Sequence, residues 1–125
     1  MVVLDTNIVI DHLRQKGGNS KLVKFAESKV SETLAISIIS IQELYEGKST
    51  TDKKEEKLLI ETLNSLKILP YTEEIAQGAG KIARDAKIKI EVADAAIAAT
   101  AIINGASLYT LDRQDFSSIP DLKLE

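Results

Sequence analysis

The chain has 125 residues, no cysteine and a formal net charge of −3. This length favours one domain, residues 1–125, built around a single core. The lack of cysteine excludes a disulfide framework and a thiolate metal site. The negative charge argues against a protein that coats nucleic acid through many Lys and Arg contacts. An aromatic content of 4% argues against a broad platform for stacking bases.

Apolar segments near the N-terminus and in the second half of the chain bear on location. The sequence starts directly with the apolar run Val2–Leu4, without a basic leader, and this pattern predicts no signal peptide. The longest apolar stretch, Ala95–Ile103, is interrupted by Thr100 and is too short to span a bilayer. We therefore expect a cytoplasmic protein that makes no membrane contact.

Short apolar runs alternate with amphipathic segments along the chain. The predicted strands are residues 2–4, 34–36, 68–70 and 106–111, with a closing edge strand at 122–124. The predicted helices are residues 8–14, a segment capped by Ser20, and residues 37–45, 50–66, 73–86 and 92–103, followed by a turn or short helix at 112–116. Strands separated by helices imply right-handed crossovers and an α/β fold with a mostly parallel sheet.

Acidic residues stand where the predicted strands pass into helices. Asp5 follows the first strand, Glu43 lies in the helix after the second, Asp94 begins an Ala-rich helix, and Asp112 and Asp115 follow a later strand. Ligand sites in parallel sheets lie beyond the carboxyl ends of the strands, so these acids can converge there. Gathered carboxylates repel one another unless a cation neutralises them, and oxygen-only ligands suit Mg²⁺ or Mn²⁺. The simplest chemistry for such a site is metal-assisted hydrolysis of a phosphodiester.

Each acid also has a simpler explanation. Asp5 and Asp94 stand near helix starts, where Asp is a preferred cap, and Glu43 fits the exposed face of an amphipathic helix. Asp94 is the more suggestive of these, because its helix is too rich in Ala and Ile to offer much exposed surface. A charge on a buried helix needs a partner or a metal. Asp112 ranks above Asp115 because it stands closer to the strand end.

Four stretches carry a family resemblance: LDTNIVID, SIISIQELYEG, DAAIAATAIINGASLYTLDRQDF and IPDLKLE. Through them the chain resembles the PIN-domain ribonucleases, and within these the VapC-type toxins of toxin–antitoxin pairs. The resemblance implies a compact PIN-like α/β fold with a central parallel sheet flanked by helices. It also implies a carboxylate quartet that binds Mg²⁺ or Mn²⁺ and cleaves RNA.

The resemblance assigns roles to the acids of this chain. The first three family acids fall on Asp5, Glu43 and Asp94. The fourth falls on Asp112, where many relatives carry Asn and use the acid at the position of Asp115, so both stay candidates. Asp5, Asp94 and Asp112 are the expected metal ligands, with the other two acids completing the shell directly or through water. Four polar residues look like supports for these acids, although capping and turn chemistry explain them equally well: Thr6, Asn7, Ser40 and Thr110.

The resemblance also implies an RNA substrate, a homodimer and a small VapB-like antitoxin. An antitoxin Arg entering the acidic site would satisfy the same electrostatics as a metal. An alternative is a catalytically inactive PIN-like binding module whose acidic rim holds a basic partner. A phospho-acceptor domain is disfavoured, because Leu4-Asp5-Thr6 holds one acid where that class usually has an adjacent acidic pair.

Other residues carry less weight. We expect His12, the single histidine, to be a partly exposed helix residue without a role in the site. Gly78 and Gly80 lie inside a helical pattern, which favours close helix packing over phosphate binding. The best candidates for RNA contacts are the basic residues nearest the acidic segments: Arg84, Lys87, Lys89 and Arg113.

Overall fold

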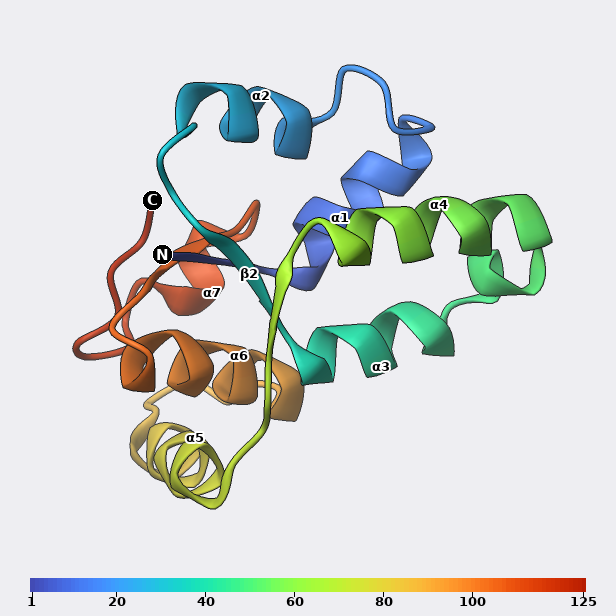
Figure 1. Ribbon diagram of the computed structural model, residues 1–125. Coiled ribbons are helices and arrows are strands. Elements are labelled where there is room, and N and C mark those ends of the chain that lie inside the picture. The colour runs from blue at the N-terminus through green and yellow to red at the C-terminus, as the bar shows by residue number, and fades with distance from the viewer.

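The fold is a four-stranded parallel sheet, seen in a computed structural model that describes residues 1–125 (Figure 1). The strands are β1 (Val2–Leu4), β2 (Leu34–Ser37), β3 (Lys67–Leu69) and β4 (Ser107–Tyr109). They lie in the order β3-β2-β1-β4. The predicted edge strand at 122–124 is reduced to one isolated bridge between Leu108 and Leu124.

Helices connect the strands. They are α1 (Thr6–Arg14), α2 (Lys21–Ser28), α3 (Ile38–Glu46), α4 (Lys53–Asn64), α5 (Glu73–Asp85), α6 (Val92–Ile103) and α7 (Arg113–Phe116), with a 3₁₀ turn, η1 (Lys48–Thr51). The predicted helix at 50–66 is therefore shorter than expected. Its first residues form η1, and the α-helix starts after Asp52, whose side chain accepts from the backbone N–H groups of Lys54 and Glu55. None of the helices is long and apolar enough to cross a membrane.

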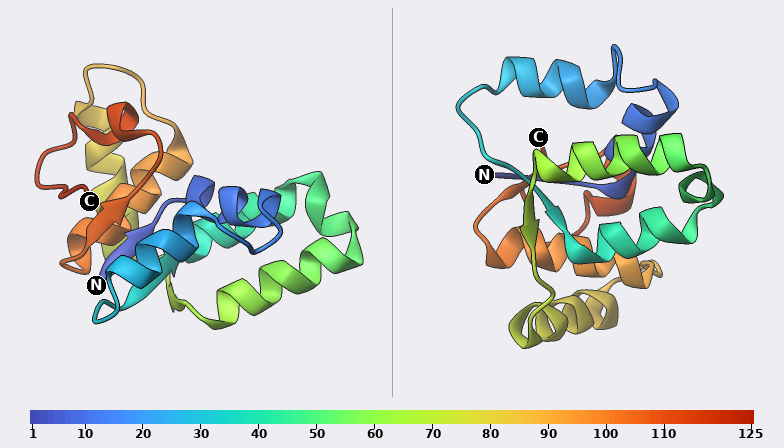
Figure 2. Two further views of the ribbon diagram at one scale, coloured as in Figure 1. Left: turned by 90° about the horizontal axis from the view of Figure 1, so that it is seen from above. Right: turned by 45° about the vertical axis from the view of Figure 1, so that its right-hand side comes forward.

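The sheet is covered on both faces, as the two views in Figure 2 show. On one face Val3, Ala35 and Leu108 pack with Ala-rich α6 and with Phe116 of α7. Side chains alternate between the faces of a strand, so Leu4 and Ile36 point the other way and pack with α1, α2, α3 and α4. Because all four strands are parallel, every helix that follows a strand directly starts at the same edge of the sheet, the carboxyl edge.

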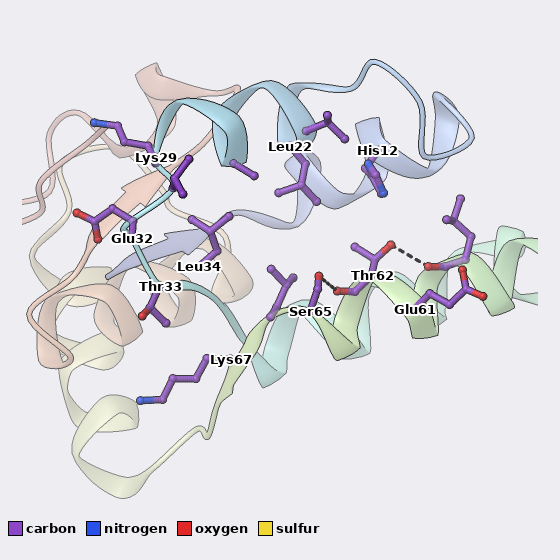
Figure 3. Close-up of a pocket in the computed structure, with 15 residues that line it drawn as sticks. His12, Leu22, Lys29, Glu32, Thr33, Leu34, Glu61, Thr62, Ser65 and Lys67 are labelled. Carbon is purple, nitrogen blue, oxygen red and sulfur yellow. Dashed lines mark hydrogen bonds between the residues drawn. The ribbon is translucent and has the colours of Figure 1, made fainter.

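A groove of about 630 Å³ lies at the opposite edge (Figure 3). It runs between α2 and α4 and reaches Leu34 and Lys67, the first residues of β2 and β3. Because the strands are parallel, a groove at their amino ends is separated by the length of the sheet from side chains beyond their carboxyl ends.

Candidate active site

Asp5 is the centre of a hydrogen-bonded network at the carboxyl end of β1. Its side chain is 5% exposed. One carboxylate oxygen accepts from the backbone N–H of Thr6 at 2.7 Å, so Asp5 itself caps α1, and Thr6 is already helical. The other oxygen accepts from the hydroxyl of Thr110, just after β4, also at 2.7 Å. Asp5 thus links the carboxyl ends of the neighbouring strands β1 and β4. It both caps α1 and lies at the carboxyl edge of the sheet, so the two explanations given for this acid hold together.

Glu43 reaches the same edge from α3. Its Oε1 accepts a 2.6 Å hydrogen bond from the Thr6 hydroxyl, whose oxygen lies 2.8 Å from Ser40 Oγ. Thr6 has one hydroxyl proton and a carboxylate only accepts, so Ser40 is the donor in the bond between the two hydroxyls. Glu43 is therefore held in a partly buried position rather than on a free helix surface.

Asp112 is linked to the network through Asn7. The Asn7 amide nitrogen donates to Asp112 Oδ2 at 3.2 Å and to Thr110 Oγ1 at 3.4 Å. The backbone N–H of Asp112 donates to the same Thr110 hydroxyl at 3.0 Å. The four polar residues expected to support the acids, Thr6, Asn7, Ser40 and Thr110, thus all contact an acid or one another.

Asp94 differs from the other acids. It is the third residue of α6, it is half-buried, and its carboxylate accepts no hydrogen bond. Glu91 occupies the capping position, so capping does not explain Asp94. Burial is the main cause that raises the pKa of Asp94 to about 6, and the charges of Asp5, Glu43, Asp115 and Glu91 add to it.

The electrostatics show that the acids act on one another. Burial also raises the pKa of Asp5, against the opposing effect of the hydrogen bonds from Thr110 and Thr6, and the charges of Glu43 and Asp112 raise it further. The charge of Asp115 raises the pKa of Asp94, and the charge of Asp112 raises the pKa of Asp5. Each candidate for the fourth acid therefore lies near one of these two carboxylates. All five acids predicted from the sequence therefore come together in space.

The donor set at this edge suits a hard cation. The donors are all oxygens. Burial first, and then the like charges of the neighbouring acids, raise the pKa values of Asp5 and Asp94, and a cation would relieve that repulsion. However, no three His, Asp or Glu side chains stand close enough together to hold an ion by direct contacts alone. Mg²⁺ keeps several of its own waters, so few direct protein ligands are needed, and the residues fit such an ion with water completing its shell.

The predicted partial exposure of His12 was wrong. His12 is buried, and its Nδ1 lies 2.7 Å from the hydroxyl of Ser20, which caps α2. The helical period alone did not show that the loop at Gly17 folds back over this ring: a Cβ on Gly17 would lie 3.7 Å from His12 Nε2. Burial lowers the pKa of His12, and the residue has a structural role outside the acidic site.

The two glycines of α5 have different environments. A Cβ at Gly78 would lie 3.2 Å from Ile103 and 3.6 Å from Ala99, so this glycine allows α5 and α6 to pack closely, as expected. A Cβ at Gly80 would meet nothing within 4 Å, so close packing does not explain that residue.

The basic residues near the acids are not equally free. Arg84 is engaged by Asp85 at 2.8 and 2.9 Å, and Arg113 donates to the backbone carbonyl of Glu125. Lys87 and Lys89, in the loop between α5 and α6, are exposed and form no ion pair. Of the predicted RNA contacts, these two lysines are the ones with a free charge.

The parallel sheet and the acids beyond its carboxyl edge place the protein among the α/β proteins that have an acidic site at the strand ends. Comparison with known proteins narrows that class. The PIN domain family model matches residues 2–122, and the chain belongs to the PIN-domain family. Ribonuclease VapC10 of Mycobacterium tuberculosis is 32% identical over 126 residues, which cover 98% of this chain and 91% of that protein. PIN-domain ribonucleases generally depend on a divalent metal.

Solved structures agree with this assignment. One is VapBC2 of Rickettsia felis bound to a promoter DNA fragment, with a TM-score of 0.86, 28% identity, and coverage of 100% of this chain and 98% of that one. FitAcB of Neisseria gonorrhoeae gives a TM-score of 0.79 at 28% identity, with 99% and 96% covered. The family and the fold predicted from the sequence are therefore confirmed.

Proposed function

We propose that this protein is a Mg²⁺- or Mn²⁺-dependent endoribonuclease and the toxin of a VapBC-type toxin–antitoxin pair. The observation that carries the proposal is the hydrogen-bonded network that holds acids from distant segments together. Asp5 and Glu43 both accept from Thr6, and Asn7 joins Asp112 to Thr110, which donates to Asp5. The 32% identity to a ribonuclease of the VapC type supports the reaction and the substrate class. A cytoplasmic location, where RNA substrates are found, is part of the proposal.

In this proposal Asp5, Asp94 and Asp112 are the metal ligands, and Glu43 and Asp115 complete the shell directly or through water. The bound ion would supply a water of lowered pKa and stabilise charge on the leaving oxygen of the phosphodiester. The Thr6 and Thr110 hydroxyls orient the carboxylates of Glu43 and Asp5, and Asn7 orients Asp112. Asp94 must be ionised to serve as a ligand, so protons compete with the cation at this residue.

The reaction is tested with the purified protein and short single-stranded RNAs. We expect cleavage in millimolar Mn²⁺ or Mg²⁺ and none in EDTA. Binding of RNA or of a basic protein without any metal-dependent cleavage would instead favour the inactive binding module.

The proposed partner is a small VapB-like antitoxin encoded beside the gene. The similar structures from Rickettsia felis and Salmonella typhimurium are described as VapBC bound to DNA. For this chain we propose that an antitoxin Arg enters the acidic site and pairs with the carboxylates, which would exclude the metal. Co-expression with the neighbouring small protein should give a stable complex without ribonuclease activity. Separate purification of the two proteins, with activity unchanged on mixing, would remove the toxin assignment and leave the nuclease.

A homodimer is the proposed oligomeric state, and the structure narrows where its interface can lie. On α2, Leu22 is buried and the Phe25 ring stacks on Tyr109 at a centroid distance of 4.1 Å, so these residues are already engaged. Ile60 on α4 is 46% exposed and remains available. Analytical ultracentrifugation of wild type and Ile60→Ser tests both the dimer and this contact.

A further inference from the structure

A second pocket shares Glu43 with the acidic site, and none of its lining residues lines the groove in Figure 3. It has a volume of about 290 Å³ and lies between the last turn of α1, the end of α3 and η1. In Figure 1 the α3–α4 connection that carries η1 forms the right-hand end of the molecule. Ile10, Leu13 and Leu44 supply an apolar surface, and Glu43 belongs to both the pocket and the acidic site. A ligand in this pocket would therefore be next to a bound scissile phosphate.

The acidic side chains that line the pocket have partners within the protein, whereas the basic ones have none. Its two carboxylates are engaged: Glu43 accepts from the Thr6 hydroxyl at 2.6 Å, and Glu55 pairs with Lys16 at 3.5 Å. Its two cations, Arg14 and Lys48, are exposed, and their side chains form no ion pair and donate no hydrogen bond. Lys16 balances Glu55, whereas the neutral Thr6 hydroxyl leaves the charge of Glu43 in place. The two free cations therefore exceed the remaining negative charge of the lining by one.

The size and the lining of the pocket suit one unstacked nucleotide. The volume lies just below the range for ligand pockets, about 300–1,000 Å³, and is too small for a duplex or a folded peptide. Single-stranded RNA is commonly recognised by splayed bases that rest on apolar, aromatic or guanidinium surfaces, while Lys contacts the phosphates. The Ser49 hydroxyl, which also lines the pocket and makes no hydrogen bond, offers a donor and an acceptor to a base edge.

We propose that this pocket binds a nucleobase flanking the scissile phosphate of single-stranded RNA, with Arg14 covering the base and Lys48 contacting a backbone phosphate. The inference rests on the proposed ribonuclease function and adds a specificity-determining subsite to it. Neither cation touches the acids, so these residues act on substrate binding and sequence preference rather than on the chemical step.

The test compares the steady-state cleavage of short single-stranded RNAs by wild type and by the double variant Arg14→Gln/Lys48→Gln in Mn²⁺. Both side chains are exposed, so the variant should fold, and its thermal melt verifies this. Lys24→Gln/Lys81→Gln is the matched control, because it removes two exposed cations on α2 and α5 that form no ion pair. We expect KM for RNA to rise about ten-fold in the pocket variant, with kcat nearly unchanged and the control close to wild type. Each lost phosphate contact should reduce the slope of log KM against log salt by about 0.7.

A second measurement isolates the base. A set of RNAs with one abasic nucleotide at successive positions around the cleavage site should reveal one flanking position where wild type loses affinity. For the pocket variant, removing the base at that position should not change the affinity. Equal KM values for the pocket variant and wild type, or the same abasic pattern in both, would overturn the subsite while cleavage by wild type upholds the nuclease. If wild type cleaves no RNA in any metal, both proposals fail.

Discussion

The two sides of the acidic site are held in opposite ways. On the β1–β4 side, Asp5 is almost fully buried, and two hydrogen bonds at 2.7 Å stabilise its ionised form. On the α6 side, Asp94 is more exposed and accepts no hydrogen bond, and its pKa is raised to about 6. Burial raises the pKa of both carboxylates, but at Asp5 the hydrogen bonds from Thr110 and Thr6 oppose that rise, whereas no hydrogen bond opposes it at Asp94. The comparison shows that donors around a buried carboxylate offset part of the effect of burial and so help it to stay charged without a cation.

The largest expected effect is the loss of catalysis when either side is neutralised. Both Asp94→Asn and Asp5→Asn keep the size of the side chain, and Asn can also replace Asp5 as the cap of α1. Each change removes a charge that we propose binds the metal, so ribonuclease activity should fall at least ~100-fold. Cleavage assays with folded variants, free of contaminating nuclease, provide the measurement. Glu27→Gln, an exposed change on α2, is the control. Wild-type rates in Asp94→Asn would remove Asp94 from the site.

The fourth acid separates the two sides further. The charge of Asp112 raises the pKa of Asp5, and its carboxylate accepts a hydrogen bond from Asn7, whereas the charge of Asp115 raises the pKa of Asp94. We expect Asp112→Asn to lose more activity than Asp115→Asn, by about ten-fold, because Asp112 joins the hydrogen-bonded network around Asp5. Cleavage rates of the two single variants decide the assignment, and the reverse order would make Asp115 the fourth acid.

Metal binding should appear in stability without any substrate. A cation bound only by the folded state adds RT ln(1 + [L]/Kd), about 2.7 kcal/mol at about 100 times Kd. Thermal melts with EDTA and with millimolar Mn²⁺ should show a rise of several degrees for wild type and a smaller rise for Asp5→Asn and Asp94→Asn. If Mn²⁺ shifts wild type no more than Asp94→Asn, these acids do not share a metal site.

The site was more predictable than the surfaces around it. Strand-then-acid patterns placed Asp5 and Asp112 correctly, because parallel strands bring their carboxyl ends to one edge whatever the details of packing. The helix at 92–103 and the strand at 2–4 were predicted at their observed bounds, because each has a strong local pattern of apolar residues. The sequence did not reveal that Glu43 shares the Thr6 hydroxyl with Ser40, since that contact joins residues 34 or more positions apart.

Features that depend on loop packing could not be predicted. The burial of His12 requires the Gly17 turn, where φ is +73°, to fold back over α1. The pocket beside Glu43 needs η1, which breaks the predicted helix at 50–66 and brings Lys48 close to Arg14. Neither event leaves a periodic signal in the sequence, because each arises from one turn rather than from a repeated spacing.

Removing a donor on the β1–β4 side should make Asp5 resemble Asp94. Thr110→Val removes the hydroxyl that donates to Asp5 and keeps the shape of the side chain. That hydrogen bond lowers the pKa of Asp5, so the acidic limb of the activity–pH profile should move to higher pH, with activity near neutral pH about ten-fold lower. Thr62→Val, which removes a hydroxyl bonded within α4, is the control. An unchanged pH profile would mean that Thr110 only stabilises the turn.

The smallest expected effect is a pH dependence of stability that belongs to Asp94. Its pKa rises from 3.8 to about 6 on folding, so between these values the unfolded chain ionises this group before the folded protein does. Stability from Asp94 is therefore fully present below about pH 4 and is lost as pH rises to about 6. The side chain is partly exposed, so solvent reduces the effect to about 1 kcal/mol. Metal-free urea melts of wild type and Asp94→Asn across this range isolate the contribution, because the other acids are common to both proteins. The difference in unfolding free energy should change between pH 4 and pH 6, with the variant becoming the more stable at the upper end, and Mn²⁺ should reverse that order near neutral pH. A constant difference at every pH would mean that Asp94 ionises as freely in the folded protein as in the unfolded chain.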